Sequence, residues 1–121
     1  MQGEEYNSMK YSFSITGRIK PKERPRRGRG GHFYTPKATI DCEGIVALEA
    51  RQGGLKPISG PLAIEAHFFG NYGTCDLDNL IKTLLDGLKL YFNDRQVIDI
   101  VAKKTQYKEH LTQVTIQSVN A

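Results

Sequence analysis

The sequence lacks the long apolar runs that a membrane span requires. Its apolar stretches, such as residues 45–50, fall far short of the roughly 20 residues that cross a bilayer as a helix. The N-terminal charge and apolar pattern of a signal peptide is missing as well. We therefore expect no contact with a membrane and a cytoplasmic location.

Cysteine and histidine are scarce and poorly placed for metal or redox chemistry. The two cysteines, Cys42 and Cys75, match no metal-binding or redox spacing, so we expect free thiols. The three histidines, His32, His67 and His110, are too scattered to suggest a zinc site. These absences exclude a disulfide framework and a zinc centre from the expected functions.

Internal repeats are absent, and the only low-complexity segment is a basic one. The chain has 121 residues, of which 39% are hydrophobic and 25% are charged, as in an ordinary globular protein. This length suits one domain and is too short for two. We expect residues 1–9 to form a disordered leader and residues 10–121 to form the single domain.

Positive charge is concentrated in residues 18–29, which hold seven of the 17 Lys and Arg but one of the 13 acidic residues. Because the whole chain carries +4 and this segment +6, the remainder carries −2. Prolines and glycines predict a basic loop at 18–31 that charge repulsion keeps open, either for a polyanionic partner or merely for solubility. The candidate DNA-binding residues are Lys20, Lys22, Arg24, Arg26, Arg27 and Arg29.

Apolar residues recur along the chain with the periods of strands and helices. The last two strand patterns flank a short polar turn at residues 108–110, so we interpret them as a hairpin. The order of elements predicts an α+β fold, a two-layer single domain with a mixed β-sheet and helices packed on one face. Helices are expected at about 37–52 and after Asp76, and strands at 11–16, 62–70, 96–107 and 111–119.

Acidic residues gather around the second helix although the chain is basic overall. Apolar residues between 77 and 88 recur at helical spacing, so one side of this helix is expected to be buried. Asp78, Lys82 and Asp86 follow one another in steps of four along a polar side. Asp76 is expected just before the helix in an extended conformation. An ordinary explanation is helix capping, together with an ion pair between Asp78 and Lys82.

A further carboxylate, Asp94, follows the helix in a turn. The strand after it can run back along the helix and bring Asp94 beside Asp76 and Asp78. Three converging carboxylates repel one another unless a cation lies among them, and oxygen ligands suit Mg²⁺ or Mn²⁺. A basic segment that holds phosphates beside such an ion describes a site for phosphodiester cleavage.

Two motifs in this region are similar to those of the RusA family of Holliday-junction resolvases. They are "DLDNLIKTLLDGL" at residues 76–88 and "NDRQV" at residues 93–97. A looser similarity includes "GRIKPKERPRR" and "FYTPK" and extends over about residues 10–107. The resemblance implies a small Mg²⁺-dependent homodimer, often encoded by phages and prophages, that nicks two symmetric strands of a four-way DNA junction.

The resemblance also implies roles for individual residues. The metal-binding catalytic carboxylates of the family correspond to Asp76, Asp78 and Asp94, and its active-site lysine corresponds to Lys82. The expected activity is therefore that of an endonuclease that resolves four-way junctions by paired nicks in recombination and repair, with Mg²⁺ as cofactor and Mn²⁺ as a substitute. Two symmetric cuts need two active sites, which also predicts a homodimer.

Other motif positions are less specific for chemistry. Asn79 and Asp86 match the family pattern, but helix capping and structural hydrogen bonds explain them as well as catalysis does. The sequence departs from the family at Asn93, where the family has the first of two aspartates. Because the family uses the second aspartate, which is Asp94 here, activity should survive.

Two alternative functions stay open from the sequence alone. The protein could be a non-catalytic nucleic-acid-binding protein, or a broader branched-DNA nuclease that acts on flaps or forks. Phe69 is a candidate for stacking on unpaired bases near a branch point, whereas Phe68 is expected in the core. If the basic segment does not bind DNA, Lys103 and Lys104 are the next candidates.

Overall fold

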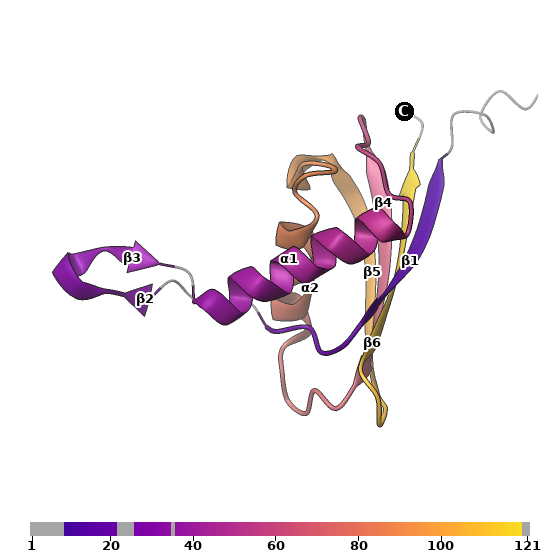
Figure 1. The fold of residues 1–121 in the computed structure, drawn as a ribbon. Coiled ribbons are helices and arrows are strands. Elements are labelled where there is room, and N and C mark those ends of the chain that lie inside the picture. Colours follow the sequence, from indigo (N-terminus) through magenta and orange to yellow (C-terminus); the bar gives the residue numbers. More distant parts are fainter. Residues whose placement is uncertain (1–8, 22–25, 35, 120–121) are drawn as a thin grey trace, which may run out of the picture.

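The computed structural model describes residues 9–21, 26–34 and 36–119, which form two β-sheets and two α-helices (Figure 1). The main sheet has four strands in the order β1-β6-β4-β5, and β2 and β3 form a separate pair. The strands are β1 (Lys10–Thr16), β2 (Arg26–Arg27), β3 (Phe33–Tyr34), β4 (Leu62–Gly70), β5 (Val97–Gln106) and β6 (Leu111–Ser118). The helices are α1 (Lys37–Gln52), α2 (Leu77–Gly87) and the short 3₁₀-helices η2 (Arg29–Gly31) and η3 (Asp94–Gln96).

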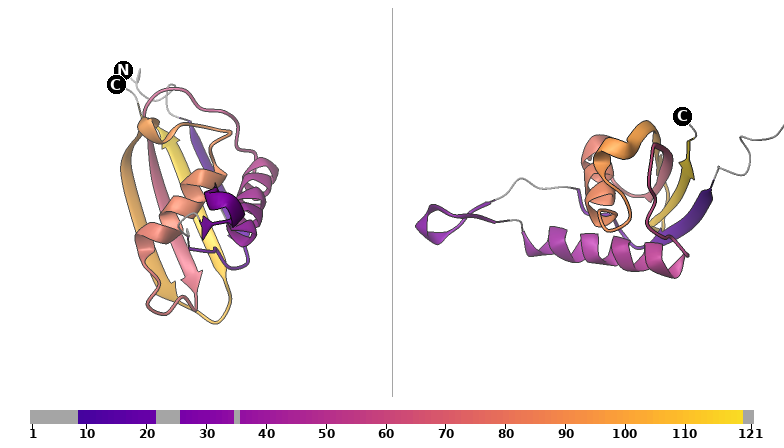
Figure 2. Two further views of the ribbon diagram at one scale, coloured as in Figure 1. Left: turned by 90° about the vertical axis from the view of Figure 1, so that its left-hand side faces the viewer. Right: turned by 90° about the horizontal axis from the view of Figure 1, so that it is seen from above.

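Both α-helices cover one face of the four-stranded sheet (Figure 2). The core forms because alternate residues of a strand, and every third or fourth residue of a helix, face the same side. The predicted α+β architecture is confirmed, and so are the predicted helix at 37–52 and the strand at 62–70. The buried residues of β4 and α2 include Leu62, Ile64, Ala66, Phe68, Leu80 and Leu84.

The two α-helices pack closely because α2 ends in a glycine. A Cβ atom on Gly87 would lie 2.7 Å from side-chain carbons of Val46 and 3.0 Å from the carbonyl oxygen of Glu43, both in α1. Contacts this short do not occur between real side chains, so any larger residue would push α1 away from α2. The glycine of the "DLDNLIKTLLDGL" motif therefore has a packing role.

The predicted hairpin of the last two strands is wrong. β5 pairs in parallel with β4, whereas β6 pairs antiparallel with both β4 and β1, so β4 lies between β5 and β6. The turn after β5 crosses the end of β4, where the Tyr107 N–H donates to the Gly70 carbonyl at 3.1 Å. Gly70 has a φ of 153° and no side chain, which leaves room for the His110 ring against its backbone.

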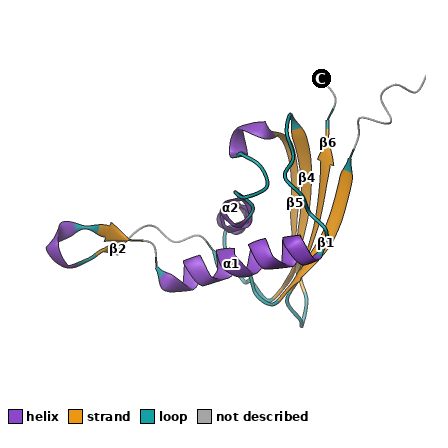
Figure 3. Cartoon of the chain, turned by 45° about the horizontal axis from the view of Figure 1, so that its top comes forward, coloured by secondary structure: helices purple, strands orange, loops and turns teal. Residues whose placement is uncertain are grey.

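The described residues of the predicted open loop at 18–31, which are 18–21 and 26–31, include regular secondary structure. Ile19 is buried, with 1% of its surface exposed. β2 pairs with β3 in a small hairpin that projects from the body beyond the start of α1 (Figures 1 and 3). The Gly28 N–H donates to the His32 carbonyl at 2.6 Å within this hairpin. We call residues 26–34 the arm.

Some predictions concern residues that the structure does not describe. Lys22, Arg24 and residues 1–8 lie outside the described residues, so the division into a leader and one domain stays a prediction. In the described ranges, no helix has the length and apolar character needed to cross a membrane.

Candidate active site

Two of the predicted metal ligands lie together at the start of α2. Asp76 precedes the helix in an extended conformation, with φ −68° and ψ 131°, as predicted. Its backbone carbonyl accepts hydrogen bonds from Asn79 and Leu80, but its side chain makes no capping hydrogen bond. Asp78 follows in the first turn, where the helix dipole favours negative charge. Both aspartates are exposed, and capping does not explain the Asp76 carboxylate.

Lys82 lies one turn further along α2, on the same polar side as Asp78. Both side chains are exposed, and no ion pair joins these two described residues. The ion-pair explanation for their spacing therefore finds no support in the structure. The ammonium group of Lys82 and the two carboxylates instead face solvent at the first turns of the helix.

Lys104 holds the loop that leads into Asp76. Its Nζ donates to the carbonyl oxygens of Cys75 at 2.5 Å and Gly73 at 3.2 Å. Lys104 pairs with the buried Phe68 in the sheet, so it lies on the helix side of β5. Sequence patterns indicated Lys104 only as an alternative DNA contact. Its bonds to the loop before Asp76 depend on the pairing of β5 with β4, which those patterns do not reveal.

His110 holds the beginning of the same loop. Its Nε2 accepts a hydrogen bond from the Asn71 N–H at 3.2 Å, and its ring packs edge-on against Tyr72 with centroids 5.1 Å apart. The absence of a side chain on Gly70 makes this approach possible. Residues 71–75 are therefore held by His110 at one end and by Lys104 at the other, and these contacts position the backbone of Asp76.

Residues 18–21, which we call the root of the basic segment, contact the middle of α2 and the loop before Asp76. The Thr83 hydroxyl donates to the Lys20 carbonyl at 2.6 Å, and the Ile19 N–H donates to the Tyr72 hydroxyl at 3.0 Å. Burial raises the pKa of Tyr72 above its usual value, so its hydroxyl stays neutral in this contact. The basic segment thus contacts the middle of α2 and the loop before it, although 63 residues separate Lys20 from Thr83.

Asp94 lies in η3, after α2 has ended. Asn93 is the N-cap of η3: its side chain accepts a hydrogen bond from the Arg95 N–H at 3.0 Å. Gln96 completes a capping box by accepting one from the Asn93 N–H at 2.7 Å. Since Asn and Asp cap helices about equally well, Asn93 can replace the aspartate expected there without disturbing η3.

Gln96 also anchors η3 beside the start of β4. Its Nε2 donates to the carbonyl oxygens of Ile58 at 2.8 Å and Gly60 at 2.9 Å. Asp94 and Asp86 line one surface hollow at this end of α2, together with a lysine and two other residues of the connecting segment. Two motif carboxylates therefore lie near the end of α2 and two near its beginning.

Asp94 consequently does not join Asp76 and Asp78 within one chain. β4 and β5 are parallel and α2 connects them, so the start of β5 and the end of β4 lie at opposite ends of the sheet. The 11 residues of α2 separate these ends by about 16 Å. The described residues contain no group of three His, Cys, Asp or Glu side chains that could hold a metal ion. β5 runs back along α2 as predicted, but Asp94 precedes the start of β5, which is the end far from Asp76.

Comparison with known proteins identifies the family. No curated protein matches the sequence. Among solved structures, CetZ from Methanosaeta thermophila strain DSM 6194 is similar over 93% of this chain and 26% of its own, with 10% identity and a TM-score of 0.38, which is too weak to bear on fold or function. The model of the family endodeoxyribonuclease RusA matches residues 16–117, which include both motifs and the basic segment. The chain therefore belongs to the RusA endodeoxyribonuclease family.

Proposed function

We propose that this nuclease resolves four-way (Holliday) junctions by paired symmetric nicks and depends on Mg²⁺. The observation that carries the proposal is the pair of exposed carboxylates, Asp76 and Asp78, with Lys82 one turn away and the root of a basic segment beside them. Capping and ion pairing do not account for these side chains. Metal-dependent cleavage of a phosphodiester bond can use carboxylates that hold the ion and positive groups near the phosphate.

Asp76 and Asp78 fit a hard divalent cation because they offer only carboxylate oxygens. We expect Mg²⁺ in the cell and Mn²⁺ as a substitute. When bound, the ion activates water and offsets charge on the scissile phosphate. The two carboxylates hold the ion, and the Lys82 ammonium stabilises negative charge that develops on the phosphate or orients the water.

A second copy of the chain would supply Asp94 to this site. β5 is an edge strand with exposed apolar side chains, including Ile98 at 62% and Val101 at 45% exposure. Antiparallel pairing of two β5 strands about a two-fold axis sets the start of one strand beside the end of the other. Because Lys104 ties the end of β5 to the loop before Asp76, such a homodimer brings Asp94 of one copy toward Asp76 of the other.

We assign the arm and its root to DNA phosphates. Arg27 and Arg29 are exposed on the projecting hairpin, and Lys20 is exposed at the root. Their mutual repulsion costs stability in the free protein, and a phosphate backbone relieves it. The proposed contacts are Lys20, Lys22, Arg24, Arg26, Arg27 and Arg29.

We place this activity in the cytoplasm of a bacterium, with the gene in the host, a phage or a prophage. Cys42 and Cys75 are free thiols, which suits a reducing compartment. The partner would be branched double-stranded DNA during recombination or repair.

Cleavage of a synthetic four-way junction tests the proposed function, with a linear duplex of the same sequence as the comparison. In Mg²⁺, the wild-type protein should nick two opposite strands of the junction at symmetric positions. Asp76→Asn, Asp78→Asn and Asp94→Asn should each reduce cleavage to background. Junction binding should persist or tighten, because a carboxylate without its metal repels DNA phosphates.

Each other outcome has a definite meaning. Junction binding without cleavage by the wild-type protein in Mg²⁺ or Mn²⁺ would indicate a non-catalytic DNA-binding protein. Equal cleavage of flaps, forks and four-way junctions would indicate a broader branched-DNA nuclease. A near-normal rate in one of the three Asn variants would remove that residue from the site.

A further inference from the structure

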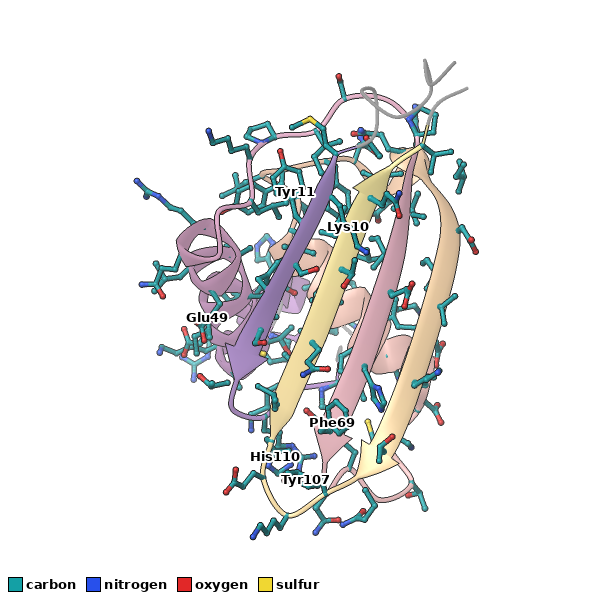
Figure 4. All side chains as sticks on the ribbon, turned by 90° about the vertical axis from the view of Figure 1, so that its right-hand side faces the viewer. Lys10, Tyr11, Glu49, Phe69, Tyr107 and His110 are labelled. Atoms are coloured by element: carbon teal, nitrogen blue, oxygen red, sulfur yellow. The ribbon has the colours of Figure 1, made fainter. Side chains whose placement is uncertain are left out.

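The face of the sheet opposite the helices carries an aromatic cluster at one end (Figure 4). Strand register places His67 and Phe69 of β4 on this open face, next to Lys103 and Thr105 of β5. Tyr107 follows β5 at the same end and lies near Phe69 (Figure 4). We call His67, Phe69 and Tyr107 the aromatic cluster.

The rings of the aromatic cluster are in contact with one another. His67 and Phe69 are stacked, with ring centroids 3.9 Å apart and planes at 19°. Phe69 and Tyr107 meet at 73°, with centroids 6.1 Å apart. A hydrogen bond of 2.6 Å between His67 Nε2 and Thr105 Oγ1 orients the imidazole. Tyr107 is 48% exposed, so the cluster presents an ordered aromatic surface to solvent.

Folding alone does not require this surface. The α-helices bury the other face of the sheet, and the open face of β1 and β6 is mostly polar, apart from Leu111, which pairs with Phe69. Aromatic groups gathered on a polar surface mark a binding site more often than a core. The polar residues on this face include Lys10, Ser12, Ser14, Gln113, Thr115 and Gln117.

Two lysines lie at the aromatic end of the open face, where they can bind phosphate groups. Along β4, β5 and the turn after β5, this end carries Lys103 and Lys108 against Glu109. Asp99 lies at the other end of β5, whereas Glu65 lies in the middle of β4 and lines one surface hollow with His67 and Lys103. Lys103, directly beside His67, is therefore the positive group on this face that a phosphate next to a stacked base would contact.

The aromatic cluster lies at the end of the sheet that carries Asp76. The Tyr107 N–H donates to the Gly70 carbonyl, and residues 71–75 lead from Gly70 to Asp76. Lys104, on the opposite side of β5 from Lys103, binds the carbonyl of Cys75 in that loop. A DNA strand at the candidate active site would need to extend only around this end of the sheet to reach the cluster.

We infer that the aromatic cluster and Lys103 form a stacking site for unpaired bases of single-stranded DNA. Aromatic rings stack on any base, and a nearby ammonium group binds the adjacent phosphate, which is how proteins hold single strands without reading sequence. The inference rests on the proposed function and extends it: unpaired nucleotides beside the cut are part of the substrate.

Fluorescence anisotropy with a labelled 12-nucleotide oligothymidylate, without divalent metal, tests the stacking site. The wild-type protein should bind this single strand, and Tyr107→Leu, Phe69→Leu and Lys103→Gln should weaken binding. Loss of one stacked base predicts a fall in affinity of about five- to a hundredfold. Affinity for a linear duplex should change little, because a duplex offers no unpaired base.

Tyr11→Leu is the matched control, because it makes the same chemical change on the helix side of β1 at the other end of the sheet. It should bind the oligonucleotide normally. Because Phe69 is partly buried, Tyr107→Leu decides the result if Phe69→Leu does not fold. Crosslinking of 5-iodouracil DNA to the wild-type protein should also label Tyr107.

Three results would overturn the stacking site: no single-strand binding by the wild-type protein, normal binding by Tyr107→Leu, or equal losses for single strand and duplex. The proposed function fails separately. A protein that binds single strands through Tyr107 but cuts no junction in Mg²⁺ would refute the proposed function alone. A protein that cuts junctions while Tyr107→Leu binds single strands normally would refute the stacking site alone.

Discussion

Some residues of the two motifs make structural contacts, whereas others leave a charged side chain in solvent. Asn93 and Gln96 close a capping box, and Gly87 lets the α-helices approach. Asp76 and Lys82 have no comparable structural contact among the described residues, and both are exposed. This difference separates the motif positions that maintain the fold from those available for chemistry.

Lys82→Ala should slow junction cleavage more than it weakens junction binding. In the proposed site, the ammonium group stabilises charge on the phosphate in the transition state, an interaction that the ground state does not need. Single-turnover rates and binding affinities of the variant measure this difference. If Lys82 only formed a surface pair, the variant would lose about 0.3 to 0.5 kcal/mol of stability, visible in its melting temperature, and would cut normally.

Lys104→Met should raise the Mg²⁺ concentration needed for half-maximal cleavage, by about tenfold or more, as for other residues that orient metal ligands. Without the bonds to Cys75 and Gly73, the loop no longer holds the backbone of Asp76 in position. A Mg²⁺ titration of the single-turnover rate measures the shift. Lys104→Arg, which keeps donors for the two carbonyls, is the matched control and should restore part of the affinity. A lower melting temperature with unchanged Mg²⁺ dependence would show that Lys104 only stabilises the fold.

At the scale of elements, the arm is the part least explained by packing. It is a two-stranded hairpin that projects from the body, and its apolar Phe33 is 72% exposed (Figure 1). Ile19, at the root, is buried and fastens the segment to the neighbourhood of α2. The arm can therefore reach a partner without losing core contacts.

Replacing Arg24, Arg26, Arg27 and Arg29 together with Ala should flatten the salt dependence of junction binding. Each phosphate contact contributes about −0.9 to the slope of log affinity against log salt, so the slope should fall by roughly 3 to 4 per protomer. Discrimination among sequences should change less than affinity, because phosphate contacts do not read bases. Affinity measured over a range of salt concentrations gives both quantities.

Lys37→Ala is the matched control for the arm, since it removes a nearby positive charge that already pairs with Asp41 at 3.0 Å. It should leave the slope unchanged. An unaltered slope in the fourfold arginine variant would instead assign the arm to solubility and move the main DNA contact to another surface, with Lys103 as the first candidate.

At the scale of the whole molecule, a site shared between two chains can be restored by mixing two inactive variants, whereas a site within one chain cannot. If Asp94 of one copy joins Asp76 and Asp78 of the other, mixing Asp76→Asn and Asp94→Asn chains leaves one intact site in each mixed dimer. Nicking should return to roughly a quarter of the wild-type value after random exchange of protomers. The measurement is the nicking rate of a four-way junction after co-refolding of the two variants.

A mixture of Asp76→Asn and Asp78→Asn chains is the control for this experiment. Both residues belong to the same half of the shared site, so every mixed dimer has two defective sites and should stay inactive. Activity of this control, or inactivity of the mixture with Asp94→Asn, would contradict the arrangement in which two chains share a site.

Local patterns were sufficient for several elements of this fold. The helix at 37–52 and the strand at 62–70 follow from apolar periodicity, since a segment that buries one face shows the period of its own geometry. The extended conformation of Asp76 before α2 was predicted in the same way. The parallel pairing of β5 with β4 was not predicted, because a strand pattern does not specify which strand lies beside it. The turn after β5 crosses the end of β4 at Gly70, so that β4 lies between β5 and β6. This contact joins residues far apart in the chain.

The sequence by itself determined the family of the chain and indicated the candidate site residues, because motif spacing along a helix needs no tertiary contact. Only the tertiary structure decided where those residues lie. Parallel pairing of β4 with β5, and the rigid length of α2 between them, place Asp94 at one end of the sheet and Asp76 at the other. Spacing along the chain could not reveal this separation, because the position of a strand's first residue depends on its direction in the sheet.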